Sequence, residues 1–331
     1  MTIFNLIRRF FRRHKPNSMD LSWLDGMEEE VNKEVDGLNT SRKIPVTPFL
    51  RKLEFVDRNG SKRNFLDRFE HARGSEVLFE EGGCLERARE IYDEFGLDDY
   101  IEKVFITAQG SFWEAGTSDP QISNHNLRIT ITIASYKLGI VNDGQTINRL
   151  DSKFFKIFED VFYHELFHAK SSVELVRAYG IDELERIKEE KSIATMAWTV
   201  LDEYIANKET AQAINFYNTH ETVRKAFDCY NNGFTRESGT GDFSEIKLIS
   251  LHQKLNYAIA TRCALADVFG NEEYHLSLSS LAENQIEYVN GIRKLLREYE
   301  SVRPINYAGY LELGERLMKL PGLSNPAWNN N

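Results

Sequence analysis

The chain has 331 residues, 41% of them hydrophobic, so it is long enough to bury a core as one large or two medium-sized domains. Its formal net charge of −10 argues against a general nucleic-acid partner, which needs a basic surface, and no stretch approaches the length of a membrane-spanning helix. Three widely spaced cysteines, Cys84, Cys229 and Cys263, predict neither a disulfide framework nor a cysteine metal site and fit a reducing, cytoplasmic compartment.

Residues 1–16 differ in character from the rest of the chain. Basic and apolar residues are interleaved there, without the apolar run and small-residue cleavage site of a secretory signal. The pattern predicts a basic amphipathic segment in which residues 1–15 contact an anionic membrane surface, dock on the acidic body of the chain or form a frayed tail. A polar connector, residues 17–48, follows. The basic positions are Arg8, Arg9, Arg12, Arg13 and Lys15.

The next segments predict a small number of strands. A hairpin is expected around Asn59-Gly60, followed by a helix at residues 84–96 and a strand at residues 100–110. The clearest strand is residues 127–135, because apolar and polar side chains alternate there with a strict period of two. Its apolar positions are Leu127, Ile129, Ile131 and Ile133.

A long buried helix is expected next, from about residue 154 to residue 179. Asp151 or Ser152 can cap its beginning, and Gly180 can end it. No proline interrupts the segment, and apolar residues recur around most of its circumference, which is typical of a helix packed on several sides. The apolar positions include Phe154, Phe155, Ile157, Phe158, Val161, Phe162, Leu166 and Phe167.

Within this helix the sequence reads His164-Glu165-Leu166-Phe167-His168, which is the pattern H-E-x-x-H. The two histidines are four residues apart and therefore lie one turn apart on the same helix face. That spacing presents two imidazoles to one zinc ion, and the glutamate between them is placed to act as a general base. Unpaired charge on a buried face is costly, so this cluster predicts a Zn2+ site.

The third ligand must come from another segment. The metzincin pattern requires a glycine three residues and a histidine six residues after the second histidine, and Ser171 and Glu174 at those positions exclude it. The other common solution is a carboxylate on a separate helix, which is expected at residues 193–217. The candidate there is Glu203, and Asp202, Glu209 and His220 also lie within reach.

Together these two segments resemble the gluzincin group of zinc metallopeptidases. In that group the glutamate ligand is followed at +3 by a small residue and at +4 by a polar residue, often aspartate; here Glu203 is followed by Ala206 and Asn207. The resemblance covers about sixty to seventy residues. It implies zinc ligation by His164, His168 and Glu203. It also implies that Asn207 supports a ligating histidine by accepting a hydrogen bond from it, without the charge of an aspartate.

The resemblance also implies a fold and a reaction. The expected fold class is α+β, with a zincin-like metallopeptidase core at residues 49–218, in which a small mixed sheet packs on the H-E-x-x-H helix and the second ligand helix. In such enzymes Glu165 activates a zinc-bound water for attack on a peptide bond. The strand at residues 127–135 is then either the edge to which a protein or peptide substrate adds or an ordinary half-buried strand. The residue that stabilises the oxyanion stays open among Tyr204, His220 and Tyr230.

Residues 219–331 are expected to form a mainly helical accessory region. Glycine, serine and asparagine are frequent at residues 231–245, which predicts an exposed loop. Helices are expected at residues 246–269, 278–299 and 307–320.

Two other functions are compatible with the same residues. One is a zincin-fold binding or scaffold protein whose metal is structural or lost, and the other is a metal-dependent hydrolase of a non-peptide substrate. The presence of Glu165 argues against the first, because a structural site needs no general base and is usually closed by four protein ligands. A fourth ligand from Asp202 or His220 would favour it.

Overall fold

The computed structural model describes residues 47–56, 59–64, 84–107, 115–134, 152–189, 192–217, 222–239 and 244–323. The predictions for residues 1–16 and for nearly all of the connector at residues 17–48 lie outside the described residues. The part of the chain from Thr47 onward forms one compact unit.

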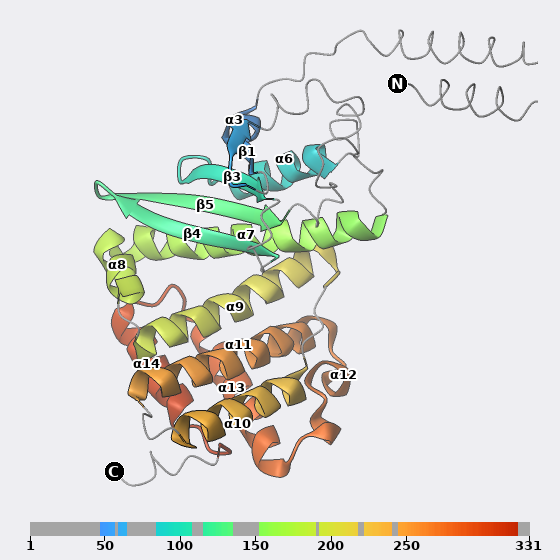
Figure 1. Cartoon of the computed structure of the whole chain (residues 1–331), viewed down its shortest axis with the longest axis vertical. Coiled ribbons are helices and arrows are strands. Elements are labelled where there is room, and N and C mark those ends of the chain that lie inside the picture. Colours follow the sequence, from blue (N-terminus) through green and yellow to red (C-terminus); the bar gives the residue numbers. More distant parts are fainter. Residues whose placement is uncertain are drawn as a thin grey trace, which may run out of the picture. The chain divides into compact units, whose positions relative to one another are not determined.

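A five-stranded mixed sheet forms one side of this unit (Figure 1). Its strands lie in the order β2-β1-β3-β5-β4; β1, β3 and β5 are parallel, and the two outer strands run antiparallel to their neighbours. The expected hairpin around Asn59-Gly60 is present as β1 and β2. The bounds are β1 (Leu53–Val56), β2 (Lys62–Asn64), β3 (Ile101–Thr107), β4 (Gly116–Ser123) and β5 (Asn126–Ala134).

The strand β5 has the predicted alternation, and of the two alternatives left open for it, a substrate-binding edge or an ordinary strand, the structure excludes the edge. Its four apolar side chains are buried, yet it pairs with β3 on one side and with β4 on the other. The alternative in which this strand receives substrate at a free edge is therefore wrong. Among the described strands, the outer strand on this side of the sheet is β4, which is joined to β5 by a tight turn in which Asn124 and His125 both have positive φ, as in a two-residue hairpin.

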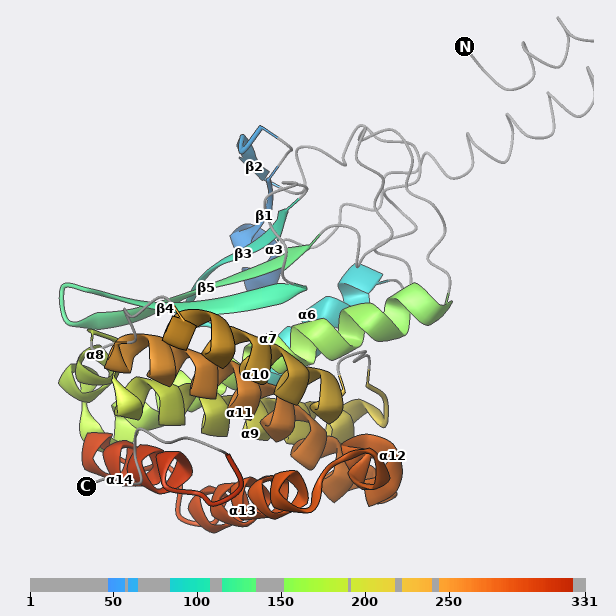
Figure 2. The ribbon, with the colours of Figure 1, turned by 60° about the horizontal axis from the view of Figure 1, so that its bottom comes forward.

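Helices pack in successive layers against the sheet (Figures 1 and 2). The helix α7 (Ser152–Tyr179) lies on β4 and β5, α9 (Ile193–Ile214) packs on α7, and α11 (Glu245–Phe269) packs on α9. The core between α7 and the sheet is apolar, with Phe158, Phe162 and Leu166 almost fully buried. The long helix and the second ligand helix are thus present where the sequence predicted them, although the second ends at Ile214.

The remaining helices complete the layers. They are α3 (Pro48–Lys52), α6 (Cys84–Phe95), α8 (Ile181–Glu189), α10 (Val223–Gly239), α12 (Glu272–Leu276), the 3-10 helix η2 (Leu278–Ser280), α13 (Glu283–Glu300) and α14 (Tyr307–Met318). The loop expected at residues 231–245 is wrong for its first nine residues, because α10 continues to Gly239. Of the helices that the structure describes, none is both long and apolar enough to cross a membrane.

Candidate metal centre

Three predicted ligand side chains converge between α7 and α9. The Nε2 atoms of His164 and His168 lie 2.9 Å apart, and Oε2 of Glu203 lies 3.5 Å from each of them. The histidines come from successive turns of α7, while Glu203 is buried in the middle of α9. These three residues form a group that could hold a metal ion, as their spacing in the sequence predicted.

The spacing of the three atoms suits an ion of the size of zinc. Zinc binds nitrogen and oxygen at about 2.0 to 2.2 Å in tetrahedral geometry, which separates ligand atoms by roughly 3.4 Å. The separations of 2.9 and 3.5 Å are close to this value. Other divalent metal ions accept the same histidine and carboxylate donors.

The pKa values of this group are shifted both by burial and by the attraction between the imidazoles and the carboxylates. Burial alone lowers the pKa of His164 and of His168, but neighbouring carboxylates outweigh it and raise both pKa values, chiefly Glu203 for His164 and Asp202 for His168. Burial raises the pKa of Glu203, yet its interactions with the two histidines hold that pKa well below the usual range. The cluster therefore favours positive charge beside its carboxylates, which a metal cation can also supply.

The orientation of Glu203 is fixed by two polar neighbours. Its Oε1 accepts hydrogen bonds from Asn207 Nδ2 at 2.7 Å and from Thr261 Oγ1 at 3.2 Å, so that Oε2 faces the histidines. The prediction that Asn207 accepts a hydrogen bond from a histidine is thus wrong. Asn207 lies one turn beyond Glu203 in α9, so its side-chain amide is placed to donate to Glu203.

Asp202, and not Asn207, contacts the far nitrogen of a candidate histidine ligand. Its Oδ2 lies 2.6 Å from Nδ1 of His168, on the side of the ring opposite Nε2. The sequence indicated Asp202 only as a metal ligand, either in place of Glu203 or as a fourth ligand. Of the remaining candidate ligands, Glu209 pairs with Arg303 at 3.0 Å, and His220 lies outside the described residues.

The base candidate Glu165 is buried beside the cluster and packs against the edge strand. A Cβ atom built on Gly116 would lie 2.6 Å from Oε1 of Glu165 and 2.7 Å from Cγ1 of Val161. Glycine at this position of β4 is therefore what allows the strand to approach the glutamate so closely.

A pocket of about 600 Å³ opens over the cluster. Its walls come from β4, α7 and α9 and from α11, which lies in the region expected to be accessory. Sequence reasoning did not anticipate α11 at the site. The residues that α11 contributes are Tyr257, Ala258, Thr261 and Arg262.

The proposed oxyanion-stabilising tyrosines lie elsewhere. The hydroxyl of Tyr204 donates to Asp267 at 2.5 Å, and the hydroxyl of Tyr230 lies 3.2 Å from His252. Neither residue lines the pocket, whereas Tyr257 does. Helical periodicity offered no signal for Tyr257, because only the packing of α11 on α9 brings it to the site.

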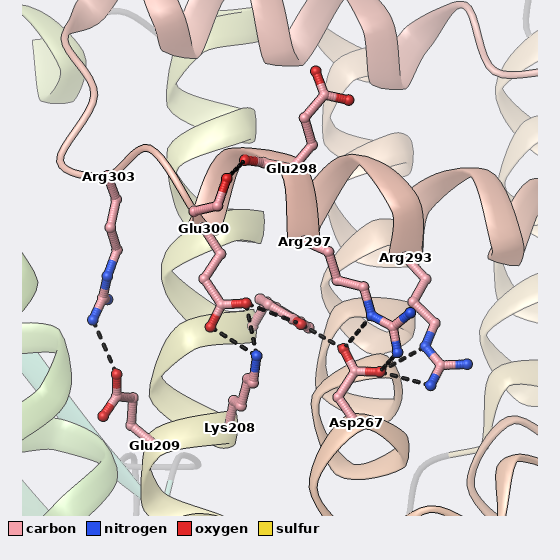
Figure 3. Close-up of polar contacts among 10 residues, drawn as sticks. Lys208, Glu209, Asp267, Arg293, Arg297, Glu298, Glu300 and Arg303 are labelled. Carbon is pink, nitrogen blue, oxygen red and sulfur yellow. Dashed lines mark hydrogen bonds and ion pairs between the residues drawn. The ribbon is translucent and has the colours of Figure 1, made fainter.

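Ion pairs hold the other face of α9 against the C-terminal helices (Figure 3). Lys208 binds Glu300 of α13 at 2.7 Å, and Tyr204 binds Asp267 of α11, which also accepts from two arginines of α13. These contacts fix the rotation of α9 about its axis, and with it the direction of Glu203. The arginines are Arg293 and Arg297.

Comparison with known proteins adds no relative: no protein-family description, no curated protein and no solved structure matches the chain.

Proposed function

We propose that the protein is a zinc-dependent hydrolase of peptide bonds. The observation that carries the proposal is the convergence of His164, His168 and Glu203 beside the buried Glu165, at the wall of a pocket that an edge strand also lines. A purely structural site would gain nothing from a buried carboxylate that is not among the ligands.

The donor set fits a catalytic site better than a structural one. Catalytic zinc sites use three protein ligands and leave one position open, whereas structural sites are closed by four. The carboxylate of Asp202 contacts Nδ1 of His168, on the side of the ring away from the three ligand atoms. A zinc ion held there would supply a Lewis acid that polarises a carbonyl and makes water a stronger nucleophile near neutral pH.

Glu165 is proposed as the general base. Its charge acts on both histidines, so it lies close to them, and Gly116 keeps its carboxylate at the pocket wall. In the proposed reaction it takes a proton from the attacking water and returns it to the leaving amine. We leave the oxyanion-stabilising residue unassigned.

The edge strand favours a polypeptide substrate. β4 has a neighbour only on its β5 side among the described strands, and its residues from Gly116 to Ser118 line the pocket. An extended peptide can add to such an edge through backbone hydrogen bonds, which holds it beside Glu165 without requiring a particular sequence.

A comparison of newly formed peptide termini tests the proposal. Cell extract is treated with the zinc-loaded wild-type protein, with Glu165→Gln and with Glu174→Gln, a control on the same helix whose carboxylate lies 3.9 Å from Lys170. We expect new termini with wild type and the control but not with Glu165→Gln, although all three bind zinc. New termini at an equal rate with Glu165→Gln, or none with wild type, would reject the proposal.

A further inference from the structure

At alternate residues of the edge strand β4 the backbone groups face away from β5, and no described strand pairs with them. The amide of Ala134 donates to the carbonyl of Ala115 at 3.0 Å, so these two residues form a hydrogen-bonded pair. In an antiparallel ladder such pairs alternate with pairs whose backbone groups point away from the partner strand. The outward-facing positions are therefore Gly116, Ser118, Pro120 and Ile122.

Gly116 marks the end of β4 that lies beside Glu165, where the proposed reaction takes place. Glu165 packs against that glycine, whereas Pro120 lies four residues farther along the strand. Because a strand rises by about 3.4 Å per residue, Pro120 is roughly 14 Å from Gly116 along β4. A peptide paired with β4 would thus run from the zinc ligands toward Pro120.

Pairing along the edge is interrupted at Pro120. Proline has no N–H to donate, and the outward carbonyl of Pro120 accepts a hydrogen bond from Nζ of Lys188. Lys188 belongs to α8 and also lies 3.5 Å from Oδ1 of Asp119. At this position the edge therefore offers no donor, and its acceptor is already engaged.

We infer that Pro120 and Lys188 close one end of the substrate-binding edge, so that substrate pairs with Gly116 and Ser118 alone. The inference rests on the proposed function and defines its substrate class: a peptide that ends within about four residues of the cleaved bond on that side. The protein then cleaves peptide bonds near the ends of polypeptides and not within long extended segments.

The positions of cleavage test this limit. Linear peptides of randomised sequence and about fourteen residues, roughly three times the available edge, are incubated with the zinc-loaded full chain, and the products are identified by mass spectrometry. We expect cuts within about four residues of the same end in every peptide. Cuts spread evenly along the peptides would overturn the inference and leave the proposed function standing.

Variants test whether the two residues set the limit. Pro120→Thr combined with Lys188→Met restores an outward N–H and frees the carbonyl, so cuts should move toward the middle of the peptides. Lys188→Met alone should shift the positions of the cuts by a smaller amount, and it serves as the test if the double variant does not fold. The control Gln121→Ala changes an exposed neighbour and should leave the pattern unchanged. An unchanged pattern in Lys188→Met and in a folded double variant would contradict the inference.

Amide hydrogen exchange separates this inference from the reaction itself. The same peptides are added to the Glu165→Gln protein, in which they are not consumed. Slower exchange at Gly116 and Ser118 but not at Ile122 supports the inference even if no peptide is cleaved by wild type. Protection that extends to Ile122, or no protection at any of these amides, would refute it.

Discussion

The carboxylate of Asp202 lies 2.6 Å from Nδ1 of His168, which leaves Nε2 of the same ring facing His164 and Glu203. The two neighbouring carboxylates of α9 thus have different roles. Glu203 faces the candidate metal position directly, whereas Asp202 contacts Nδ1 of His168 and orients that ring so that its Nε2 faces the same position. A carboxylate on the far nitrogen fixes the tautomer and raises the basicity of a ligating histidine.

Replacement of Asp202 should weaken metal binding without abolishing it. In Asp202→Asn the negative charge of the carboxylate beside Nδ1 of His168 is lost while the shape of the side chain is kept, and we expect zinc affinity to fall by about 10- to 100-fold. Competition with a chromophoric chelator measures the change. The control is Glu209→Gln on the same helix, which loses only its pairing with Arg303. Equal affinities for Asp202→Asn and wild type would show that the contact does not support the ligand.

The hydroxyl of Thr261 should contribute to the same affinity through Glu203. Thr261→Val keeps the volume but removes the hydrogen bond to Oε1, so the carboxylate can rotate away from the histidines. A hydrogen bond to a charged group is worth about 1.5 kcal/mol or more, which corresponds to roughly a tenfold loss of zinc affinity.

Thr199→Val provides the matched control for this measurement. Thr199 also lines the pocket, but its hydroxyl donates to the carbonyl of Thr195 in its own helix. A double-mutant cycle with Asn207→Leu should show coupling, because Asn207 and Thr261 share one acceptor. If both threonine variants bind zinc equally, Thr261 has no part in orienting Glu203.

The two histidine ligands could be predicted from the sequence because their placement depends on local geometry, whereas Glu203 was preferred to Asp202, Glu209 and His220 through the resemblance to a known pattern. A four-residue spacing puts His164 and His168 on one helix face in any context, and the second helix was evident from its alanine-rich, uninterrupted sequence. The strand β5 was predicted for a similar reason, since the alternation of apolar and polar residues is a local feature of its own sequence.

The supporting residues depend on packing between distant segments. Thr261 reaches Glu203 only because α11 packs on α9, and nothing in its own neighbourhood distinguishes it from other helical threonines. The edge strand β4 was missed because its eight residues, GTSDPQIS, contain a single large aliphatic side chain. Its proline argued against a strand, and only the edge position makes that proline compatible with the sheet.

Gly116→Ala should separate catalysis from metal binding. The added methyl would lie 2.6 Å from Oε1 of Glu165, so the glutamate must move, while His164 and His168 are not among the atoms nearest to it. Because general-base catalysis contributes about 10²- to 10⁴-fold, we expect kcat to fall by at least roughly tenfold at unchanged zinc content. The control Gly233→Ala meets Leu251 at the same distance, outside the pocket, and should affect stability alone. Retention of full kcat by Gly116→Ala would show that Glu165 does not depend on this close approach.

The stability of the fold should depend on pH through His252, which is remote from the metal ligands. Its ring is buried between the hydroxyls of Tyr230 and Tyr288, and burial lowers its pKa to about 4. The unfolded chain binds a proton at this histidine below about pH 6.5. The folded chain does not bind it until about pH 4, so the free energy of unfolding should fall as the pH decreases through this window.

Urea unfolding at pH 7 and pH 5 measures this contribution of His252. The loss of unfolding free energy between these pH values should be about 2 kcal/mol larger for wild type than for His252→Gln. Carboxylates also titrate in this range, but they are common to both proteins and cancel in the difference. Tyr230→Phe keeps the buried imidazole and should therefore retain the wild-type pH dependence even where its absolute stability is lower. An identical pH dependence in wild type and His252→Gln would mean that the imidazole gains access to water, and a proton, without unfolding of the chain.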